Sequence, residues 1–259
     1  MELRLLAVGD VVGESGLAFL SKRLRGLKKE YDIHFTVVNG ENCAGVGILP
    51  QQAEDLFTAG ADVVTLGNHT WNRIQIKDLL DDVSWLLRPA NYTSRVPGRG
   101  LGIYEGPRGL RVAVMNLIGR CEMDCNFDNP FFKADALLKQ ADCDLVVADL
   151  HAEATSEKGA MAWYLDGRVQ ALWGTHTHVP TADCKILPKG LGFVTDVGMT
   201  GPAHSVLGMD PEQAMGRFLG ALPRRFEAAP GPCQLNAVLF TIETKTKRCL
   251  SVQRIDVFE

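Results

Sequence analysis

Residues 62–69 read DVVTLGNH, a β-branched apolar run that ends in two polar side chains, Asn68 and His69. Four further runs have the same form: LLAVGD (5–10), TVVNGEN (36–42), LVVADLH (145–151) and ALWGTHTH (171–178). Each run has the length and composition of a buried strand. Ligands of an open α/β sheet bind beyond the carboxyl ends of its strands. The pattern therefore predicts an α/β fold in which the polar strand ends meet at one edge of one sheet.

The side chains at these five strand ends carry oxygen and nitrogen atoms and no thiolate. They are Asp10, Glu41, Asn42, Asn68, His69, Asp149, His151, His176 and His178. Burying carboxylate and imidazole groups together costs free energy unless a partner compensates their charge and polarity. A divalent cation can bind all of them at once. Such ligands favour two iron, manganese or zinc ions over a structural zinc. Glu41 is the candidate bridge, because a bridging carboxylate holds two cations about 3.5–4 Å apart.

The histidines at the last two strand ends are the strongest candidate ligands. His176 and His178 stand two residues apart, so their rings would face one point on an extended segment. His151 has Asp149 two residues before it, and this carboxylate either orients an imidazole through its second nitrogen or caps the next turn. Both interpretations of Asp149 stay open.

Composition limits the class of protein. The 259 residues are 46% hydrophobic, which fits one domain over 1–259. The formal net charge of −4 does not indicate the basic surface with which proteins bind duplex nucleic acid. No apolar run resembles a signal peptide or approaches the ~20 residues of a membrane span. The seven cysteines include no CxxC pair and are expected to be reduced thiols. We therefore expect a soluble, cytoplasmic protein without membrane contact.

Apolar periodicity predicts alternating elements along the chain. Helices are predicted at 15–30, 50–59, 73–80, 133–141 and 156–165, and strands at 3–8, 34–38, 62–66, 85–88, 111–117, 144–148 and 169–173. Segment 121–132 lacks a clear period and is predicted to be a loop. The last quarter alternates like antiparallel strands in LGFVTDVG (191–198), CQLNAVLFTIET (233–244) and RCLSVQRIDVFE (248–259). It predicts a second sheet packed on the first.

Six sequence blocks together resemble a known family. GDVVG (9–13), NGEN (39–42), GNHTWN (67–72), DLHAE (149–153) and GTHTHVPT (174–181) are similar to blocks of the calcineurin-like metallophosphoesterase superfamily, and TDVGMTGP (195–202) is similar to its bacterial YmdB-like branch of 2′,3′-cyclic-nucleotide phosphodiesterases. The resemblance extends from Gly9 to about Gly208. Val12 stands where the superfamily usually has a histidine, and Glu41 replaces the usual bridging aspartate. Asn42 is expected to fill the position that Val12 leaves.

The resemblance implies a four-layer α/β/β/α sandwich and a role for each site residue. It implies Asp10, Glu41, Asn42 and His178 as ligands of a first metal, and Glu41, Asn68, His151 and His176 as ligands of a second. His69 would be the proton donor. The implied metal is iron, with manganese or zinc as alternatives, and the implied assembly is a homo-oligomer, a dimer or a tetramer.

The implied reaction is hydrolysis of a 2′,3′-cyclic nucleotide, or another small phosphodiester, to a 3′-nucleotide. A water or hydroxide activated by two metals would attack phosphorus, and His69 would protonate the departing ribose oxygen. In TDVGMTGP, Gly198 and Gly201 either bring backbone amides close to a phosphate or form a tight turn. The candidate substrate-binding residues there are Gly198, Met199 and Thr200. Oxidation of Cys43, next to Asn42, is a further hypothesis, and a small buried turn residue is its alternative.

Three other classes of function compete with this one. A phosphomonoesterase or nuclease on the same metal core would need more Lys and Arg near the ligands than these segments contain. A regulatory or scaffolding protein could bind metals for stability, but His69 would then have no function as a proton donor. A dinucleotide-binding protein would need a GxGxxG after the first strand, and the chain has none there.

Overall fold

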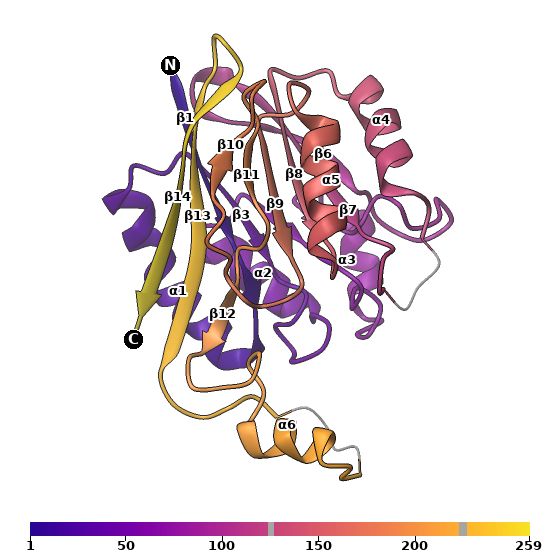
Figure 1. Ribbon diagram of the computed structural model, residues 1–259, viewed down its shortest axis with the longest axis vertical. Helices are drawn as coiled ribbons and strands as arrows, with labels where there is room; N and C mark the ends of the chain where they lie inside the picture. Colours follow the sequence, from indigo (N-terminus) through magenta and orange to yellow (C-terminus); the bar gives the residue numbers. More distant parts are fainter. Residues whose placement is uncertain (124–126, 223–226) are drawn as a thin grey trace.

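Two mixed β-sheets packed face to face carry helices on their outer surfaces (Figure 1). The computed structural model describes residues 1–123, 127–222 and 227–259. Within them, the four layers are helices, sheet, sheet and helices, which confirms the fold class expected from the sequence. The helices are α1 (Gly13–Glu30), α2 (Pro50–Ala59), α3 (Ile76–Asp82), α4 (Pro130–Gln140), α5 (Thr155–Leu165) and α6 (Pro211–Phe218), with a short 3-10 helix at Pro107–Gly109.

Among the described residues, eight strands form the first sheet. In spatial order they are β2 (Asp10–Val11), β12 (Met199–Pro202), β13 (Cys233–Glu243), β1 (Glu2–Val8), β3 (Phe35–Asn39), β4 (Val63–Thr65) and β5 (Leu86–Leu87), with β14 (Arg248–Phe258) on the other edge of β13. β1, β3, β4 and β5 run parallel, and β13 is antiparallel to β1 with Leu5 opposite Phe240.

Six strands of the described part of the chain form the second sheet. In spatial order they are β10 (Lys185–Ile186), β11 (Gly192–Val194), β9 (Ala171–Thr175), β8 (Leu145–His151), β7 (Arg111–Ile118) and β6 (Leu101–Glu105). β7, β8, β9 and β11 run parallel, while β6 and β10 are antiparallel edge strands.

Strands buried on both faces explain the continuous apolar runs of the sequence. On β1, Leu5 and Ala7 face the core between the sheets, whereas Leu6 and Val8 pack under α1. Trp173 of β9 meets Phe240 of the first sheet across the central core, with ring centroids 5.9 Å apart. A parallel sheet covered on both faces needs no polar alternation, so these strands appear as unbroken hydrophobic segments.

The C-terminal strands correct one sequence prediction. β13 and β14 do not form the second sheet but extend the first, because β13 pairs along much of its length with β1. The second sheet comes from residues 101–194, and β11 within LGFVTDVG is parallel to β9. Alternating hydrophobicity indicates an antiparallel strand but carries no information about its partner.

Helix boundaries agree best where the chain supplies a local signal. α2 begins at Pro50 and ends before Gly60, as predicted from those two residues. α4 begins at Pro130 rather than at 133, because the Asn129 side chain accepts hydrogen bonds from the backbone at Phe131 and Phe132. The predicted loop 121–132 was therefore too long, and its residues 124–126 lie outside the described part of the chain.

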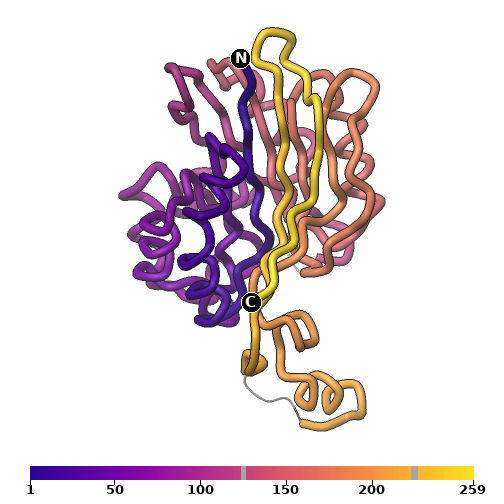
Figure 2. The backbone as a smooth tube through the Cα atoms, turned by 90° about the vertical axis from the view of Figure 1, so that its left-hand side faces the viewer, coloured from indigo at the N-terminus to yellow at the C-terminus, as the bar shows by residue number. Residues whose placement is uncertain are grey.

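Residues 203–222 and 227–232 extend from the end of the sandwich where β12 and β13 meet (Figures 1 and 2). This segment carries α6, which the sequence patterns did not predict. TDVGMTGP, predicted to be a nest or a turn, contributes β12 to the first sheet. Among the described helices, none combines the length and the apolar character that crossing a membrane requires.

Candidate metal centre

The candidate site lies where the carboxyl ends of strands from both sheets converge. The first sheet supplies Asp10 in β2, Glu41 and Asn42 after β3, and Asn68 and His69 after β4, and the second supplies His151 at the end of β8 and His176 and His178 after β9. The expectation that one sheet carries all of them was wrong. The ligand-bearing strands β3 and β4 of the first sheet run parallel to each other, as do β8 and β9 of the second, so the sequence pattern of the two sheets is the same.

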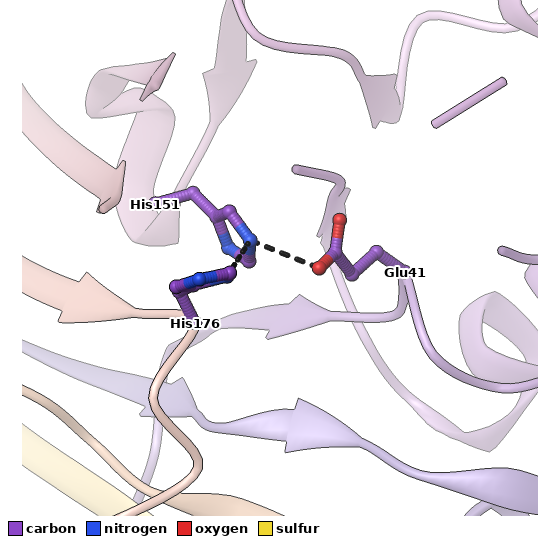
Figure 3. Close-up of side chains that lie close together, drawn as sticks. All are labelled: Glu41, His151 and His176. Carbon is purple, nitrogen blue, oxygen red and sulfur yellow. Dashed lines mark hydrogen bonds and ion pairs between the residues drawn. The ribbon is translucent and has the colours of Figure 1, made fainter. Parts of the chain in front are cut away.

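The His151 cluster consists of Glu41, Asn68, His151 and His176. Nε2 of His151 lies 2.9 Å from Oε1 of Glu41, 2.9 Å from Oδ1 of Asn68 and 3.0 Å from Nδ1 of His176. Figure 3 shows the Glu41 carboxylate and both imidazoles directed at one another. One nitrogen carries at most one hydrogen, so hydrogen bonds cannot satisfy all three contacts. Ligand atoms at right angles around a cation with bonds of about 2.1 Å lie about 3 Å apart, and this donor set fits a cation.

A relay of hydroxyl groups fixes the orientation of the His151 ring. The Thr175 hydroxyl donates to Oδ1 of Asp149 over 2.8 Å, and Nδ1 of His151 lies 3.0 Å from the same hydroxyl oxygen. Because that oxygen has given its hydrogen to Asp149, it accepts one from Nδ1 of His151. Nδ1 therefore carries a hydrogen, and Nε2 is the nitrogen that a metal can bind. Asp149 thus orients the imidazole through Thr175, and within the described part of the chain its carboxylate accepts from the hydroxyls of Thr65 and Thr175 rather than from the next turn.

The charges of the cluster compensate one another. Burial raises the pKa of Glu41, but His151 outweighs it and lowers this pKa to about 2. Burial lowers the pKa of His151, but the Glu41 carboxylate, with Asp10 and Asp149, raises it to about 9. Burial and the neighbouring His151 lower the pKa of His176 to about 3. A proton on His151 thus supplies the positive charge that a metal ion would supply in its place.

The Asp10 cluster consists of Asp10, Asn42 and His178. Nε2 of His178 lies 3.1 Å from the side-chain amide nitrogen of Asn42 and 3.9 Å from Oδ1 of Asp10. This buried Oδ1 has no hydrogen-bond partner among the described residues, and burial raises the pKa of Asp10. His178 donates from Nδ1 to the backbone oxygen of Leu207 over 3.0 Å, so Nε2 faces the cluster. Turning the Asn42 amide over would present its oxygen there.

The backbone that carries the two histidines is not extended. β9 ends at Thr175, and His176 and His178 have φ angles of 102° and 64°. The expectation that strand alternation aligns their rings was therefore wrong. His176 joins the His151 cluster and His178 joins the Asp10 cluster. Left-handed conformations of this kind cost about 1–3 kcal/mol each and persist where the surrounding structure enforces them.

Gly67 allows the His151 cluster to close. A Cβ atom on Gly67 would overlap the His151 ring and Oε2 of Glu41. The same Oε2 accepts a hydrogen bond of 3.1 Å from the backbone of His69. The glycine of GNHTWN thus lies directly under the ligands, and the turn after β4 is tied to Glu41.

The His69 ring lies beside the His151 cluster and outside its set of ligand atoms. Its Nε2 is 3.5 Å from the Asn68 amide nitrogen, and its Nδ1 is 3.4 Å from Oδ1 of Asn72. The side chain is partly exposed. This position leaves His69 accessible to a substrate next to the ligands.

The backbone around Gly198 is already engaged within the chain. Gly198 donates to Oδ1 of Asp196 over 2.9 Å, and Met199 donates to Oδ1 of Asn236 over 3.2 Å. Thr200 pairs with Leu235 in the first sheet and is fully buried. The amide of Gly198, one of the two that the sequence suggested for phosphate contact together with Gly201, is therefore already used within the chain. Substrate contact by Gly198, Met199 or Thr200 stays a prediction.

Sequence reasoning missed two side chains that contact the candidate ligands. Nε2 of His176 lies 3.2 Å from Oε2 of Glu153, the final residue of DLHAE. The Asn39 side chain accepts from the backbone of Glu41 over 3.1 Å and donates to Thr175 over 3.3 Å. Both residues stand inside the sequence blocks that carry ligands, and that neighbourhood was the available signal.

Cys43 is poorly suited to oxidation. The residue is fully buried, and burial raises the pKa of its thiol. Because the thiolate is the reactive form, the hypothesis of a redox-sensitive Cys43 loses its chemical basis. The alternative of a small buried residue in the turn agrees with the structure.

Comparison with known proteins extends the motif resemblance to nearly the whole chain. Residues 6–255 match the family model of YmdB-like proteins. A 2′,3′-cyclic-nucleotide 2′-phosphodiesterase of Bacillus subtilis strain 168 is 46% identical over 256 residues, which are 98% of this chain and 96% of that protein.

Two crystal structures share the fold. A hypothetical protein from Thermus thermophilus superimposes with a TM-score of 0.92 at 39% identity, over 99% of this chain and 100% of that one. A novel phosphatase from Mycoplasma pneumoniae superimposes with a TM-score of 0.93 at 34% identity, over 100% and 94% of the two chains. The family that the motif blocks predicted is thereby confirmed, and this chain belongs to the YmdB-like family.

Proposed function

We propose that this protein is a phosphodiesterase with a dinuclear metal centre. Membership of the YmdB-like family and 46% identity to a phosphodiesterase over nearly the whole chain make it a hydrolase of phosphoric esters. The observation that supports the metal centre is the crowding around Nε2 of His151, where three heteroatoms lie within 3.0 Å. Hydrogen bonding cannot account for this arrangement, whereas a cation would.

The two clusters correspond to two proposed metal positions. One ion would be held by Glu41, Asn68, His151 and His176, and the other by Asp10, Glu41, Asn42 and His178. Glu41 is the proposed bridge. Family members use divalent metals, and iron, with manganese or zinc as alternatives, is our proposal for their identity.

The residues of the chain supply positioning and a proton. The two ions, when bound, would lower the pKa of a bound water and neutralise the phosphate oxygens. Thr175 and Asp149 hold the hydrogen on Nδ1 of His151, so Nε2 is the nitrogen that would bind a metal once its proton is displaced. His69, tied to Glu41 through its backbone N–H, would donate a proton to the departing oxygen. Asn72, 3.4 Å from Nδ1 of His69, would orient that ring.

The proposed substrate is a 2′,3′-cyclic nucleotide, hydrolysed to a 3′-nucleotide. This substrate class comes from the Bacillus subtilis relative. Hydrolysis of phosphomonoesters is the second candidate, because the Mycoplasma pneumoniae structure is described as a phosphatase. A monoester dianion would benefit from a cationic clamp, and neither His69 nor any of the seven proposed ligands is Lys or Arg.

Metal analysis of the native protein, paired with a hydrolysis screen, tests the proposal. The screen would cover 2′,3′- and 3′,5′-cyclic nucleotides, nucleoside monophosphates and aryl phosphates, with His151→Ala as the control for contaminating activity. We expect two transition-metal ions per chain and faster turnover of a cyclic nucleotide than of any monophosphate. Faster turnover of a nucleoside monophosphate would favour the phosphatase instead.

Three further expectations from the sequence stay predictions. Residues 1–259 are proposed to act as one metallophosphoesterase domain, since one core lies between the two sheets. A homo-oligomer, dimer or tetramer, and a cytoplasmic location are the others.

A further inference from the structure

A buried ion pair lies behind the candidate metal centre. Nζ of Lys158 on α5 donates to Oδ2 of Asp196 over 2.7 Å, and each side chain is only 1% exposed. The lysine stem crosses β9 at Gly174, where a Cβ atom would overlap its Cδ and Cε. The ammonium group thus reaches Asp196 only because residue 174 has no side chain.

The Asp196 carboxylate receives two further donors, and both belong to the backbone. Oδ2 accepts from Thr177 over 3.2 Å, and Oδ1 accepts from Gly198 over 2.9 Å. All three partners of this carboxylate are therefore donors. A carboxylate with two oxygens satisfies them, whereas an amide of the same shape has only one accepting oxygen.

These two backbone contacts lead to both ligand clusters. Thr177 stands between His176 and His178, where the chain adopts positive φ at both histidines. Gly198 has a φ of 98°, and its carbonyl accepts the backbone N–H of Asp10 over 3.1 Å. One carboxylate therefore holds the turn that presents the two histidines and the turn that holds Asp10.

We propose that Lys158 and Asp196 are positioning residues for the metal centre, with Asp196 fixing the backbone of its ligands and Lys158 compensating the buried charge of Asp196. A carboxylate buried this deeply without a positive partner would destabilise the folded protein. The pair lies too deep for direct contact with solvent, and it acts through Thr177 and Gly198. This inference rests on the proposed metal centre.

Three variants separate positioning from general stabilisation: Lys158→Met, Asp196→Asn and the double variant. Lys158→Met leaves the buried Asp196 carboxylate without its positive partner and should lower the melting temperature of the metal-free protein. The double variant removes that charge and should recover much of the loss. The amide introduced by Asp196→Asn still cannot accept from both Thr177 and Gly198, so we expect the double variant to bind Mn²⁺ about 10–100-fold more weakly than the wild type does.

Mn²⁺ binding is measured by the loss of the EPR signal of the free ion, alongside the melting temperature. The matched control is Arg168→Met, which removes the ion pair between Arg168 and Asp135 outside the site. This control should bind Mn²⁺ like the wild type. If the double variant binds Mn²⁺ like the wild type, affinity merely follows the melting temperature. That result overturns the positioning role and leaves the proposed function in place. A wild-type chain that binds no metal overturns the proposed function and this inference with it.

Discussion

The hydroxyl of Thr65 on β4 donates a hydrogen bond of 2.5 Å to Oδ2 of Asp149 on β8, and so joins the two sheets beneath His151. Both residues are fully buried. Burial raises the pKa of Asp149 to about 6, although Thr65, His151 and Thr175 act in the opposite direction. The carboxyl group is therefore ionised at neutral pH. An ionised Asp149 accepts from both hydroxyls, and this fixes the hydrogen of Thr175 away from His151.

Thr175→Val should weaken metal binding about 10–100-fold with little change of shape. The substitution removes the oxygen that accepts the Nδ1 hydrogen of His151, so the ring loses its preference for the tautomer with a free Nε2. Calorimetric titration with Mn²⁺ measures the effect. Thr65→Val is the matched control, because it removes a hydroxyl from Asp149 without touching His151. Equal weakening in both variants would show that the relay has no specific role.

Metal affinity should depend on pH through His151. Burial lowers the pKa of this ring, but Glu41, Asp10 and Asp149 raise it from 6.5 to about 9 in the metal-free protein. A metal must therefore displace a proton at neutral pH. We expect Mn²⁺ affinity to rise about tenfold per pH unit up to about pH 9, with heats of binding that vary with the ionisation enthalpy of the buffer. A flat affinity over this interval would contradict a protonated His151.

The same shift predicts how the metal-free fold responds to pH. Because the folded-state pKa of His151 is raised, its stabilisation is fully present below pH 6.5 and is lost as the pH rises through about 9. The melting temperature of the metal-free protein should fall over this range, and His151→Gln should lack this component. Metal-free melting curves at a series of pH values, for wild type and variant, provide the measurement.

Glu41→Gln should remove both metals or leave them loosely held. Oε1 of Glu41 faces His151, and the proposed bridge serves two cations where each other ligand serves one. Elemental analysis after gel filtration measures the metal content. Asn68→Ala is the comparison, since it removes a ligand of one proposed position only. A full metal complement in Glu41→Gln would place the bridge on another residue.

His69→Ala should keep its metals and lose turnover by roughly 10²–10⁴-fold, the usual share of a general acid. The ring lies outside the ligand atoms of the His151 cluster, while the backbone contact to Glu41 survives the substitution. The deficit should shrink for a nitrophenyl ester, because its leaving oxygen needs no proton. Loss of metal, or equal impairment on both kinds of substrate, would make His69 a ligand or a binding residue.

Local sequence patterns predicted much of the fold and the identities of the candidate ligands. The five strand runs, the Pro50 start and Gly60 end of α2, and the polar residues after each strand follow from interactions within a few residues. The family resemblance added what residue chemistry left open, namely the proposed division of the candidate ligands between two metals. The helix start at Pro130 was missed although its Asn129 cap is a local signal.

The partners of each element were decided only by the tertiary structure. β13 could have joined either sheet on the evidence of its sequence, and its pairing with β1 depends on which apolar faces fit together in the central core. The contacts from Thr65 to Asp149 and from Lys158 to Asp196 likewise join residues 84 and 38 positions apart.

The amino-acid sequence by itself determined which strands end in oxygen and nitrogen donors, because strand length and turn chemistry are local properties. Only the tertiary structure decided that two sheets share these donors, that His176 and His178 leave the strand at positive φ, and that Thr175 sets the His151 tautomer. Each of these depends on buried groups finding partners across the core, where an unpaired polar atom is too costly to leave. That requirement acts between distant segments, and no local pattern records it.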